Sequence, residues 1–176
     1  GDPARMFDGR MDDVAWFNTA LNVTERNALR TVGVEAAQAD TAGANAAGRL
    51  NATSVAGGNL IAYWNLDDAP GTTNVAGDGG TSIVLHTTPP VAQFVPGGKF
   101  GGALDFDGLD SYATFQDASF DVGARGTLSF WVQMDNVTRR NQFFEGPGNS
   151  NLEFQYRNNS NGQFYGRVQD NGDVVI

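Results

Sequence analysis

Apolar and polar side chains alternate along most of the chain after residue 60, and this period of two is typical of half-buried β-strands. In the first segment, one face is expected to hold Leu60, Ala62, Trp64 and Leu66. Similar segments follow as GALDFDG, SYATFQ, TLSFWVQM, LEFQYR and QFYGRVQ, with turns rich in Gly, Asn and Asp between them. The pattern predicts an all-β fold in which antiparallel strands form a β-sandwich.

The first 34 residues follow a different order, with a short strand before a short helix. The residues suited to the strand are Met11, Val14, Trp16 and Phe17. Asn22 is followed three residues later by Glu25, which resembles the capping box that begins many helices. We therefore expect one short helix near the N-terminus, directly after the strand.

Between these two parts lies a polar segment, residues 35–59, that is rich in Ala and Gly. Its only sizeable apolar side chains are Leu50 and Val55, which are too few to build a core. The segment is therefore predicted to be a linker. The chain divides into residues 1–34, the linker at 35–59, and a second strand-rich part at 60–176.

Composition and charge narrow the classes of partner. The chain of 176 residues contains 23 Gly and 12 Phe, and its formal net charge is −9. Nucleic acids and anionic membranes need a basic surface, so neither is an expected partner. Every apolar run is far shorter than the roughly 20 residues of a membrane-spanning helix, so membrane insertion is not expected. Because the chain lacks cysteine, disulfides and thiolate metal sites are excluded.

Four segments carry a family resemblance. FDGRMDDVAWFNTALNVTERNALR comes first, and LIAYWNLDDAPGTT, VPGGKFGGALDFDGLDSYATF and GTLSFWVQM follow. The last three resemble the opening half of a laminin-G-like, concanavalin-A-like lectin-glucanase jelly-roll domain, whereas the first resembles the closing motif of such a domain. The resemblance implies the tail of one tandem repeat in residues 1–34 and the opening part of the next in residues 60–176. The jelly roll would then be incomplete and the chain a fragment of a larger protein.

The resemblance also implies a non-catalytic module that binds carbohydrate or mediates adhesion in a secreted or cell-surface protein. Its ligand would be a glycan or an extracellular protein. Jelly-roll glycosidases place two carboxylates about the scissile bond. The chain has only four Glu, none of them closely paired along a strand, and its single histidine, His86, lies at a strand end beside prolines. Catalysis is therefore not expected, although a jelly-roll domain of, or accessory to, a polysaccharide-degrading enzyme is the alternative.

Side chains that face away from the core are the candidates for ligand binding. If Leu152, Phe154 and Tyr156 point inward, the residues between them point outward, together with residues of neighbouring strands. The candidate ligand-binding set is Trp131, Gln155, Arg157, Tyr165 and Arg167. Amides, guanidinium groups and aromatic rings suit the hydroxyls and C–H faces of sugars. The competing interpretation is the ordinary polar face of a half-exposed sheet.

A calcium site is implied by the resemblance at the loop GPGNSN, where the family would place its first ligands. Asn149 and Asn151 supply carbonyl oxygens, which are acceptable donors for Ca²⁺. They supply no charge, whereas the family often has Asp at these positions. Asp67 and Asp78 are available as further ligands, although Asp in such loops is more often a turn former.

The order of the segments predicts an unusual strand pairing. In jelly rolls of this family the closing strand lies antiparallel beside the opening strand, and the only closing strand in this chain precedes the opening one. A flexible linker of about 23 residues spans roughly 25 to 30 Å, which is enough to return the chain to that edge. We therefore expect residues 12–17 to pair with residues 61–66 and to bury Trp16. The competing expectation is a detached N-terminal tail.

Overall fold

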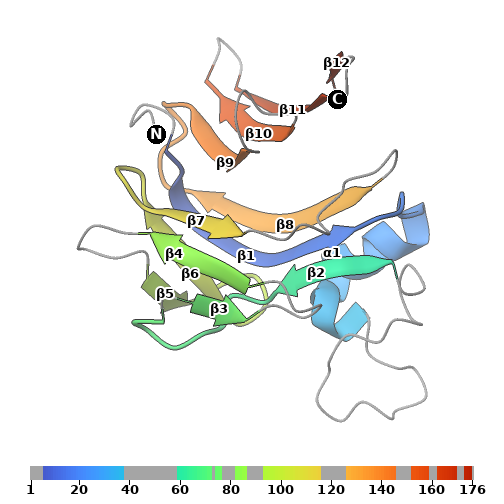
Figure 1. Cartoon of the computed structure of the whole chain (residues 1–176), viewed down its shortest axis with the longest axis horizontal. Helices are drawn as coiled ribbons and strands as arrows, with labels where there is room; N and C mark the ends of the chain where they lie inside the picture. The colour runs from blue at the N-terminus through green and yellow to red at the C-terminus, as the bar shows by residue number, and fades with distance from the viewer. Residues whose placement is uncertain are drawn as a thin grey trace.

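The computed structural model describes residues 6–37, 59–72, 74–76, 82–86, 93–115, 126–145, 152–158, 162–169 and 173–175 (Figure 1). These residues contain one helix, α1 (Val23–Ala37). Their strands are β1 (Asp8–Phe17), β2 (Leu60–Trp64), β3 (Asn74–Ala76), β4 (Ser82–His86), β5 (Gln93–Pro96), β6 (Gly102–Asp107), β7 (Tyr112–Phe115), β8 (Thr127–Met134), β9 (Asn141–Glu145), β10 (Leu152–Arg157), β11 (Gln163–Gln169) and β12 (Asp173–Val175). The prediction of an all-β chain with one short helix is confirmed.

The strands form three antiparallel sheets. The first has the order β2-β1-β6-β5, and β8 pairs with the other edge of β1. The second has the order β12-β11-β10-β9, and the third has the order β3-β4-β7. Figure 1 shows β1 running through the middle of the molecule between β8 and β2, with the second sheet on the far side of β8. The strand that comes first in the chain is therefore the centre of the first sheet.

The predicted pairing of β1 with β2 is confirmed. Val14 lies opposite Trp64 and Trp16 lies opposite Ala62 in an antiparallel ladder. Trp16 is only 3% exposed, as expected for a residue at this seam. The expectation of a detached N-terminal tail is wrong, because β1 also pairs with β6 and β8.

The predicted face of the segment 60–66 is correct except at its first residue. Ala62, Trp64 and Leu66 all belong to the main core. Leu60 instead packs against a second cluster on the other side of the sheet. The reason is a register shift between Trp16 and Phe17, which pairs Phe17 with Leu60 and leaves Ile61 unmatched. An extra residue in one strand reverses the side on which the following side chain lies.

A break in the middle of β1 allows two strands to share one of its edges. Residues 8–11 pair with β6, and residues 14–17 pair with β2. Between them, Asp13 has a φ of 55°, which is uncommon for a non-glycine residue. The ladder with β8 also shifts register between Asp12 and Ala15. Both aspartates at the break are buried, with exposed fractions of 3% and 2%.

The main core lies between the first sheet and the two other sheets. Strands β1, β2, β4, β5 and β6 contribute its buried apolar side chains, and β7, β8 and β9 add half-buried ones. Leu128, Phe130 and Val132 of β8 pack against this core, as the alternation predicted. The Phe130 ring lies 5.0 Å from the Phe144 ring and 5.9 Å from the Phe143 ring, so β8 and β9 meet through aromatic contacts.

Helix α1 covers the opposite face of β1 and β2. Leu21 and Leu29 join Ala15, Phe17 and Tyr63 in the second buried cluster. The helix extends to Ala37 and therefore three residues into the predicted linker, of which residues 38–58 lie outside the described part of the chain. It is not long and apolar enough to cross a membrane.

The predicted capping box starts the helix. The Glu25 backbone N–H donates to Asn22 Oδ1 at 3.1 Å, and the Asn22 N–H donates to Glu25 Oε2 at 2.7 Å. Near the other end, Gly33 has a φ of 82° and kinks the helix. A Cβ at Gly33 would lie 2.9 Å from a ring carbon of Phe100, so glycine permits both the kink and the close approach of this ring.

The turn between β6 and β7 is held by one carboxylate. Asp107 Oδ1 accepts hydrogen bonds from the Ser111 hydroxyl and from the backbone N–H groups of Leu109, Asp110 and Ser111. Burial alone would raise the pKa of Asp107, but these hydrogen bonds lower it below its usual value. The turn carries the chain from the first sheet to the third, so its two flanking strands do not form a hairpin.

Candidate binding site

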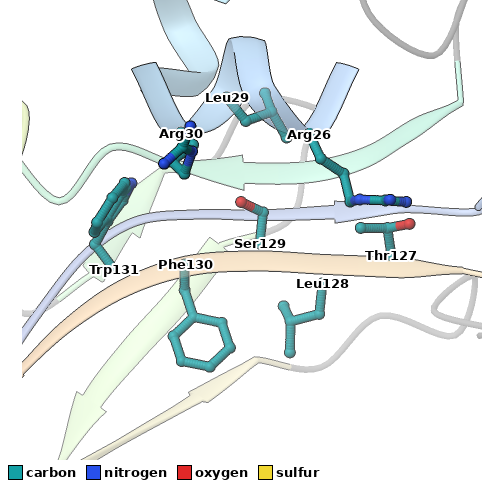
Figure 2. A pocket seen from close by; sticks show the side chains of 8 residues that line it. All are labelled: Arg26, Leu29, Arg30, Thr127, Leu128, Ser129, Phe130 and Trp131. Atoms are coloured by element: carbon teal, nitrogen blue, oxygen red, sulfur yellow. The ribbon is translucent and has the colours of Figure 1, made fainter. Parts of the chain in front are cut away.

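A groove lies between α1 and β8, on the face of β8 that points away from the main core (Figure 2). Its volume is about 270 Å³, and its lining residues are Arg26, Leu29, Arg30, Thr127, Leu128, Ser129, Phe130 and Trp131. Figure 2 shows Thr127, Ser129 and Trp131 pointing toward the helix, whereas Leu128 and Phe130 point to the other side of β8. The alternation of β8 therefore supplies polar and indole groups to the groove and apolar groups to the core.

Hydrogen bonds at one end of the groove hold the helix in place over β8. The Thr127 hydroxyl donates to the Thr19 carbonyl at 2.9 Å and accepts from the Leu21 N–H at 3.0 Å. Arg26 Nη1 donates to the Leu21 carbonyl at 2.5 Å. These contacts join the start of β8 to the segment between β1 and α1, so the separation of the groove walls is fixed.

Trp131 forms the other end of the groove. Its indole is half-buried and meets the Phe100 ring edge to face, with centroids 6.1 Å apart and planes at 76°. Lys99 Nζ lies 4.9 Å from the Trp131 centroid and 5.8 Å from the Phe100 centroid, which are cation–π distances. The loop between β5 and β6 therefore covers part of the Trp131 indole.

Two carboxylates, the buried Asp12 and the exposed Asp67, fix the loop that carries Lys99 and Phe100. Asp12 Oδ2 accepts the Phe100 N–H at 2.9 Å, and Asp67 Oδ1 accepts the Gly102 N–H in a short hydrogen bond. Burial raises the pKa of Asp12 to about 6 and the neighbouring charges of Asp13 and Asp67 add to the rise, although backbone hydrogen bonds oppose it. The Tyr63 hydroxyl donates to Asp13 Oδ1 at 2.7 Å. The break in β1 thus holds the loop that places Phe100 against Trp131 at this end of the groove.

The other predicted binding residues lie on the second sheet. Gln155 pairs with Tyr165 and Glu153 pairs with Arg167 across β10 and β11. The Arg157 guanidinium lies 3.5 Å from the centroid of the Tyr165 ring, so these two side chains stack on each other. The backbone of Arg167 is described, and its side chain lies outside the described part of the structure.

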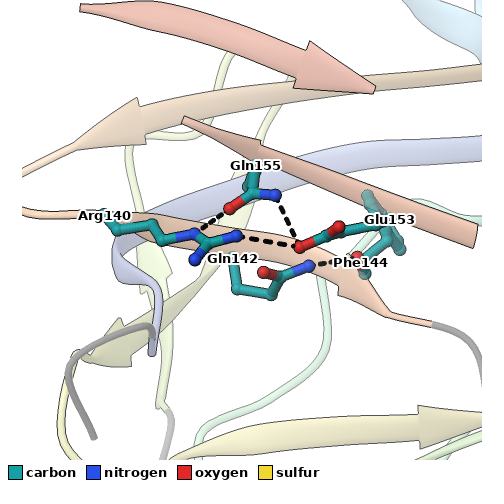
Figure 3. Close-up of polar contacts among 5 residues, drawn as sticks. All are labelled: Arg140, Gln142, Phe144, Glu153 and Gln155. Atoms are coloured by element: carbon teal, nitrogen blue, oxygen red, sulfur yellow. Dashed lines mark hydrogen bonds and ion pairs between the residues drawn. The ribbon is translucent and has the colours of Figure 1, made fainter. Parts of the chain in front are cut away.

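Gln155 is part of a buried polar network rather than an outward-facing group (Figure 3). It is 1% exposed, accepts a short hydrogen bond from Arg140 Nε, and donates to Glu153 Oε1 at 2.5 Å. Arg140 Nη2 also forms an ion pair with Glu153 at 3.1 Å. The expectation that Gln155 is available to a ligand is wrong, because Arg140 and Glu153 already use both ends of its amide. Alternation along a strand gives the face of a residue but not what covers that face.

The structure divides the predicted binding set between two surfaces. Trp131 points away from β9, since its neighbour Phe130 contacts Phe143 and Phe144 on the opposite side of β8. Arg157 and Tyr165 stack on the second sheet instead. The two groups therefore do not form one site, and among the described residues a groove lies at Trp131.

The implied calcium ligands, Asn149 and Asn151, lie outside the described residues, as does Asp78. Asp67 lies inside them and holds Gly102 of the loop between β5 and β6. Among the described residues, no group of three or more His, Asp or Glu side chains is placed to hold a metal ion. His86 stacks on Tyr112 with ring centroids 4.6 Å apart, and its Nε2 lies 2.7 Å from Thr114 Oγ1.

Arg26, Arg30 and Ser129, which line the groove, and Lys99, which lies over the Trp131 ring, were not among the residues predicted from the sequence. The sequence did contain a signal for the two arginines. The capping box at Asn22 fixes where the helix begins, and residues four apart lie on the same face of a helix. Arg26 and Arg30 have that spacing. The position of this face above β8 depends on contacts between distant parts of the chain, such as the one from Thr127 to Leu21.

Comparison of the chain with protein-family models, with curated proteins and with solved structures gives no match.

Proposed function

We propose that the chain is a non-catalytic carbohydrate-binding or adhesion module of the laminin-G-like jelly-roll type, in a secreted or cell-surface protein. The observation that carries this proposal is the groove between α1 and β8, where the half-buried indole of Trp131 stands at one end and Arg30 and Ser129 lie beside it. The ligand we favour is a glycan, and an extracellular protein is the alternative partner.

The chemistry of the groove suits a sugar. A pyranose ring has an apolar C–H face that stacks on an aromatic ring and an edge of hydroxyl groups that needs hydrogen-bond partners. Trp131 offers the ring, Arg30 offers guanidinium donors, and Ser129 offers a hydroxyl. Within the described residues, the Ser129 side chain makes no hydrogen bond, so it is available to a ligand.

The arrangement of strands supports the jelly-roll part of the proposal. The segment that resembles a closing motif, β1, pairs antiparallel with the segment that resembles an opening strand, β2. The main core lies between sheets, as a sandwich requires. The extracellular or cell-surface location and a Ca²⁺ ion at the loop of Asn149 and Asn151 follow from the resemblance and remain proposals.

The test is titration of the chain with a panel of oligosaccharides, followed by the same titration of variants. Trp131→Ala should weaken binding by about 1 to 3 kcal/mol, the usual cost of removing an aromatic anchor. Tyr112→Ala is the matched control, because Tyr112 is an aromatic residue that is 48% exposed on the third sheet. Loss of binding in Arg157→Ala with unchanged binding in Trp131→Ala would move the site to the second sheet. Absence of binding to every saccharide would refute a carbohydrate function.

A further inference from the structure

The loop between β5 and β6, residues 97–101, lies over the Trp131 end of the groove. Lys99 Nζ is 4.9 Å from the centroid of the indole, and the Phe100 ring meets the indole edge to face at 6.1 Å. On another side the Phe100 ring lies against α1, because a Cβ at Gly33 would be 2.9 Å from a ring carbon. Lys99 therefore occupies space over the indole that a stacked ligand ring would need.

Glycine pairs flank the tip of this loop, whose sequence at residues 97–102 is GGKFGG. Gly97 and Gly101 have φ of 92° and 97°, which residues with a Cβ rarely adopt. The ladder of β5 and β6 ends where Pro96 pairs with Gly102, so the glycines begin where the strands stop. Such residues can absorb the change in backbone angles that a hinge requires. The tip can therefore move while β5 and β6 stay paired.

Two carboxylates hold the tip in its closed position. Asp12 Oδ2 accepts the Phe100 N–H at 2.9 Å, and Asp67 Oδ1 accepts the Gly102 N–H. Asp12 is only 3% exposed, and its Oδ1 is buried without a hydrogen-bond partner among the described residues. An ionised carboxylate at this position lacks solvation for as long as the loop is closed.

From this geometry we propose that residues 97–101 form a pH-sensitive lid over Trp131, with Asp12 as its latch. The lid opens on its glycine pairs, which hydrates Asp12 and uncovers the indole. The movement needs no ligand, but its use in controlling access to the groove rests on the proposed function.

The charged groups around Asp12 determine the direction of the response. Asp13 is the next residue of β1 and Asp67 follows β2, and both negative charges oppose ionisation of Asp12. Within the described residues, Asp12 forms no ion pair with a cation. Strand β8 has no charged side chain. The other charged or titratable groups on the elements packed here are Arg10 on β1, Tyr63 on β2, Asp68 after it, Asp105 on β6, Lys99 in the loop and Arg30 on α1.

Ionisation of Asp12 should favour the open lid. With the loop closed, burial raises the pKa of Asp12 from 3.8 to about 6, although backbone hydrogen bonds from Phe100 and Lys99 oppose the rise. Opening hydrates the carboxylate and returns its pKa toward 3.8. The closed lid is therefore favoured most below pH 3.8, and this preference is lost as pH rises through about 6. A difference of about two pKa units limits the change in the ratio of open to closed lid to about a hundredfold.

The test is hydrogen exchange of the Phe100 backbone amide in the ligand-free chain, measured by NMR from pH 4.5 to pH 8. Its protection factor should fall by roughly ten- to a hundredfold across this range. Asp12→Asn should make the protection independent of pH. The Leu109 amide is the internal control, because it is held by Asp107, whose pKa is lowered, and its protection should stay constant. Asp107→Asn is the matched variant and should leave the fall at Phe100 unchanged.

Exposure of the indole provides a second readout. In chain labelled with 5-fluorotryptophan, the fluorine signal of Trp131, assigned with Trp131→Phe, should become more sensitive to exchange of H₂O for D₂O as pH rises. Trp16 and Trp64 are each 3% exposed and should show no such change. A Trp131 signal whose solvent sensitivity is the same at pH 4.5 and pH 8 would overturn the proposal.

Amides of the β1–β2 ladder distinguish lid opening from unfolding of the whole chain. If protection at Phe100 equals theirs and changes with theirs, a single global opening explains both and the lid is refuted. Constant protection at Phe100, or a fall that persists in Asp12→Asn, would also refute it.

Gly98→Ala keeps the test decisive if Asp12→Asn fails to fold. A Cβ at Gly98 would clash with the Gly102 carbonyl oxygen, so the closed loop cannot form. Phe100 should then lose protection at every pH while the β1–β2 amides keep theirs, and retained protection at Phe100 would overturn the lid. None of these measurements uses a saccharide, so failure of the lid leaves the proposed function intact, and absence of sugar binding leaves the lid intact.

Discussion

Replacing Asp12 with Asn tests whether a buried carboxylate at the break in β1 controls stability. Asp12 is 3% exposed, and its Oδ2 accepts the Phe100 N–H at 2.9 Å. Its Oδ1 has no hydrogen-bond partner among the described residues. Asn keeps the shape and the acceptor oxygen and removes the charge, so Asp12→Asn changes the ionisation of this site with little change in packing.

The expected size follows from the pKa of Asp12, which burial raises from 3.8 to about 6. Each pKa unit corresponds to about 1.36 kcal/mol, so keeping this carboxylate ionised in the folded state costs about 3 kcal/mol at neutral pH. Because the folded pKa is the higher one, this group stabilises the protein most below pH 3.8, and that stability is lost as pH rises through about 6. In Asp12→Asn, the side-chain NH₂ group that replaces Oδ1 lacks a hydrogen-bond acceptor, which lowers the free energy of unfolding by about 1 to 3 kcal/mol at every pH.

The assay is denaturant unfolding of both proteins at pH 4.0 and pH 7.5. The free energy of unfolding of Asp12→Asn, relative to the parent, should rise by about 2 to 3 kcal/mol from the lower to the higher pH. Asp107→Asn is the control. The pKa of Asp107 lies below 3.8, so the difference in free energy of unfolding between Asp107→Asn and the parent should change only at more acidic pH. A constant difference between Asp12→Asn and the parent, or a fall toward neutral pH, would refute this account of the break in β1.

Three further predictions concern the helix cap, the loop at the groove and calcium. Asn22→Ala should lower stability by about 0.5 to 2 kcal/mol in denaturant unfolding, because it removes the cap acceptor at Glu25 N–H, whereas Asn27→Ala, on an exposed helical position, should not. Gly101→Ala should cost more than Gly71→Ala: both have φ near 90°, but a Cβ at Gly101 would lie 2.6 Å from Asp67 Oδ1 and one at Gly71 would meet nothing within 4 Å. Equal melting temperatures for these two variants would contradict that assignment. If the loop of Asn149 and Asn151 binds Ca²⁺, a chelator should lower the melting temperature, and no difference from calcium-loaded protein would exclude the site.

Local patterns predicted the parts of the fold that depend on local physics. Alternation placed Leu128, Phe130 and Val132 on the core side of β8, and the spacing of Asn22 and Glu25 predicted the start of α1. The pairing of β1 with β2 followed from the order of two motifs and the reach of a linker. These features are determined by side-chain period, by capping and by chain length.

The features that the sequence did not predict depend on contacts between distant residues. Leu60 changes face because of a register shift that has no signal in its own segment. Gln155 was expected to be exposed, but Arg140 of the preceding turn reaches over it. The groove needs α1 to lie above β8, and this position is fixed by Thr127 and Leu21, 106 residues apart. A pattern of alternation contains no information about these partners.

The central position of β1 has a consequence for the order of folding. Its partners are the strands that begin at Leu60, Gly102 and Thr127, and the Asp8 N–H bonds to the side chain of Asn141, 133 residues away. Strand β1 is therefore synthesised before all three of these partner strands, and its sheet is completed only after the last of them has been made. Closing such long loops costs chain entropy before any contact repays it, which makes folding slow. Until these strands have been synthesised, the backbone edges and apolar side chains of β1 lack their native partners. We therefore expect chaperone binding and intermolecular misfolding to involve this segment.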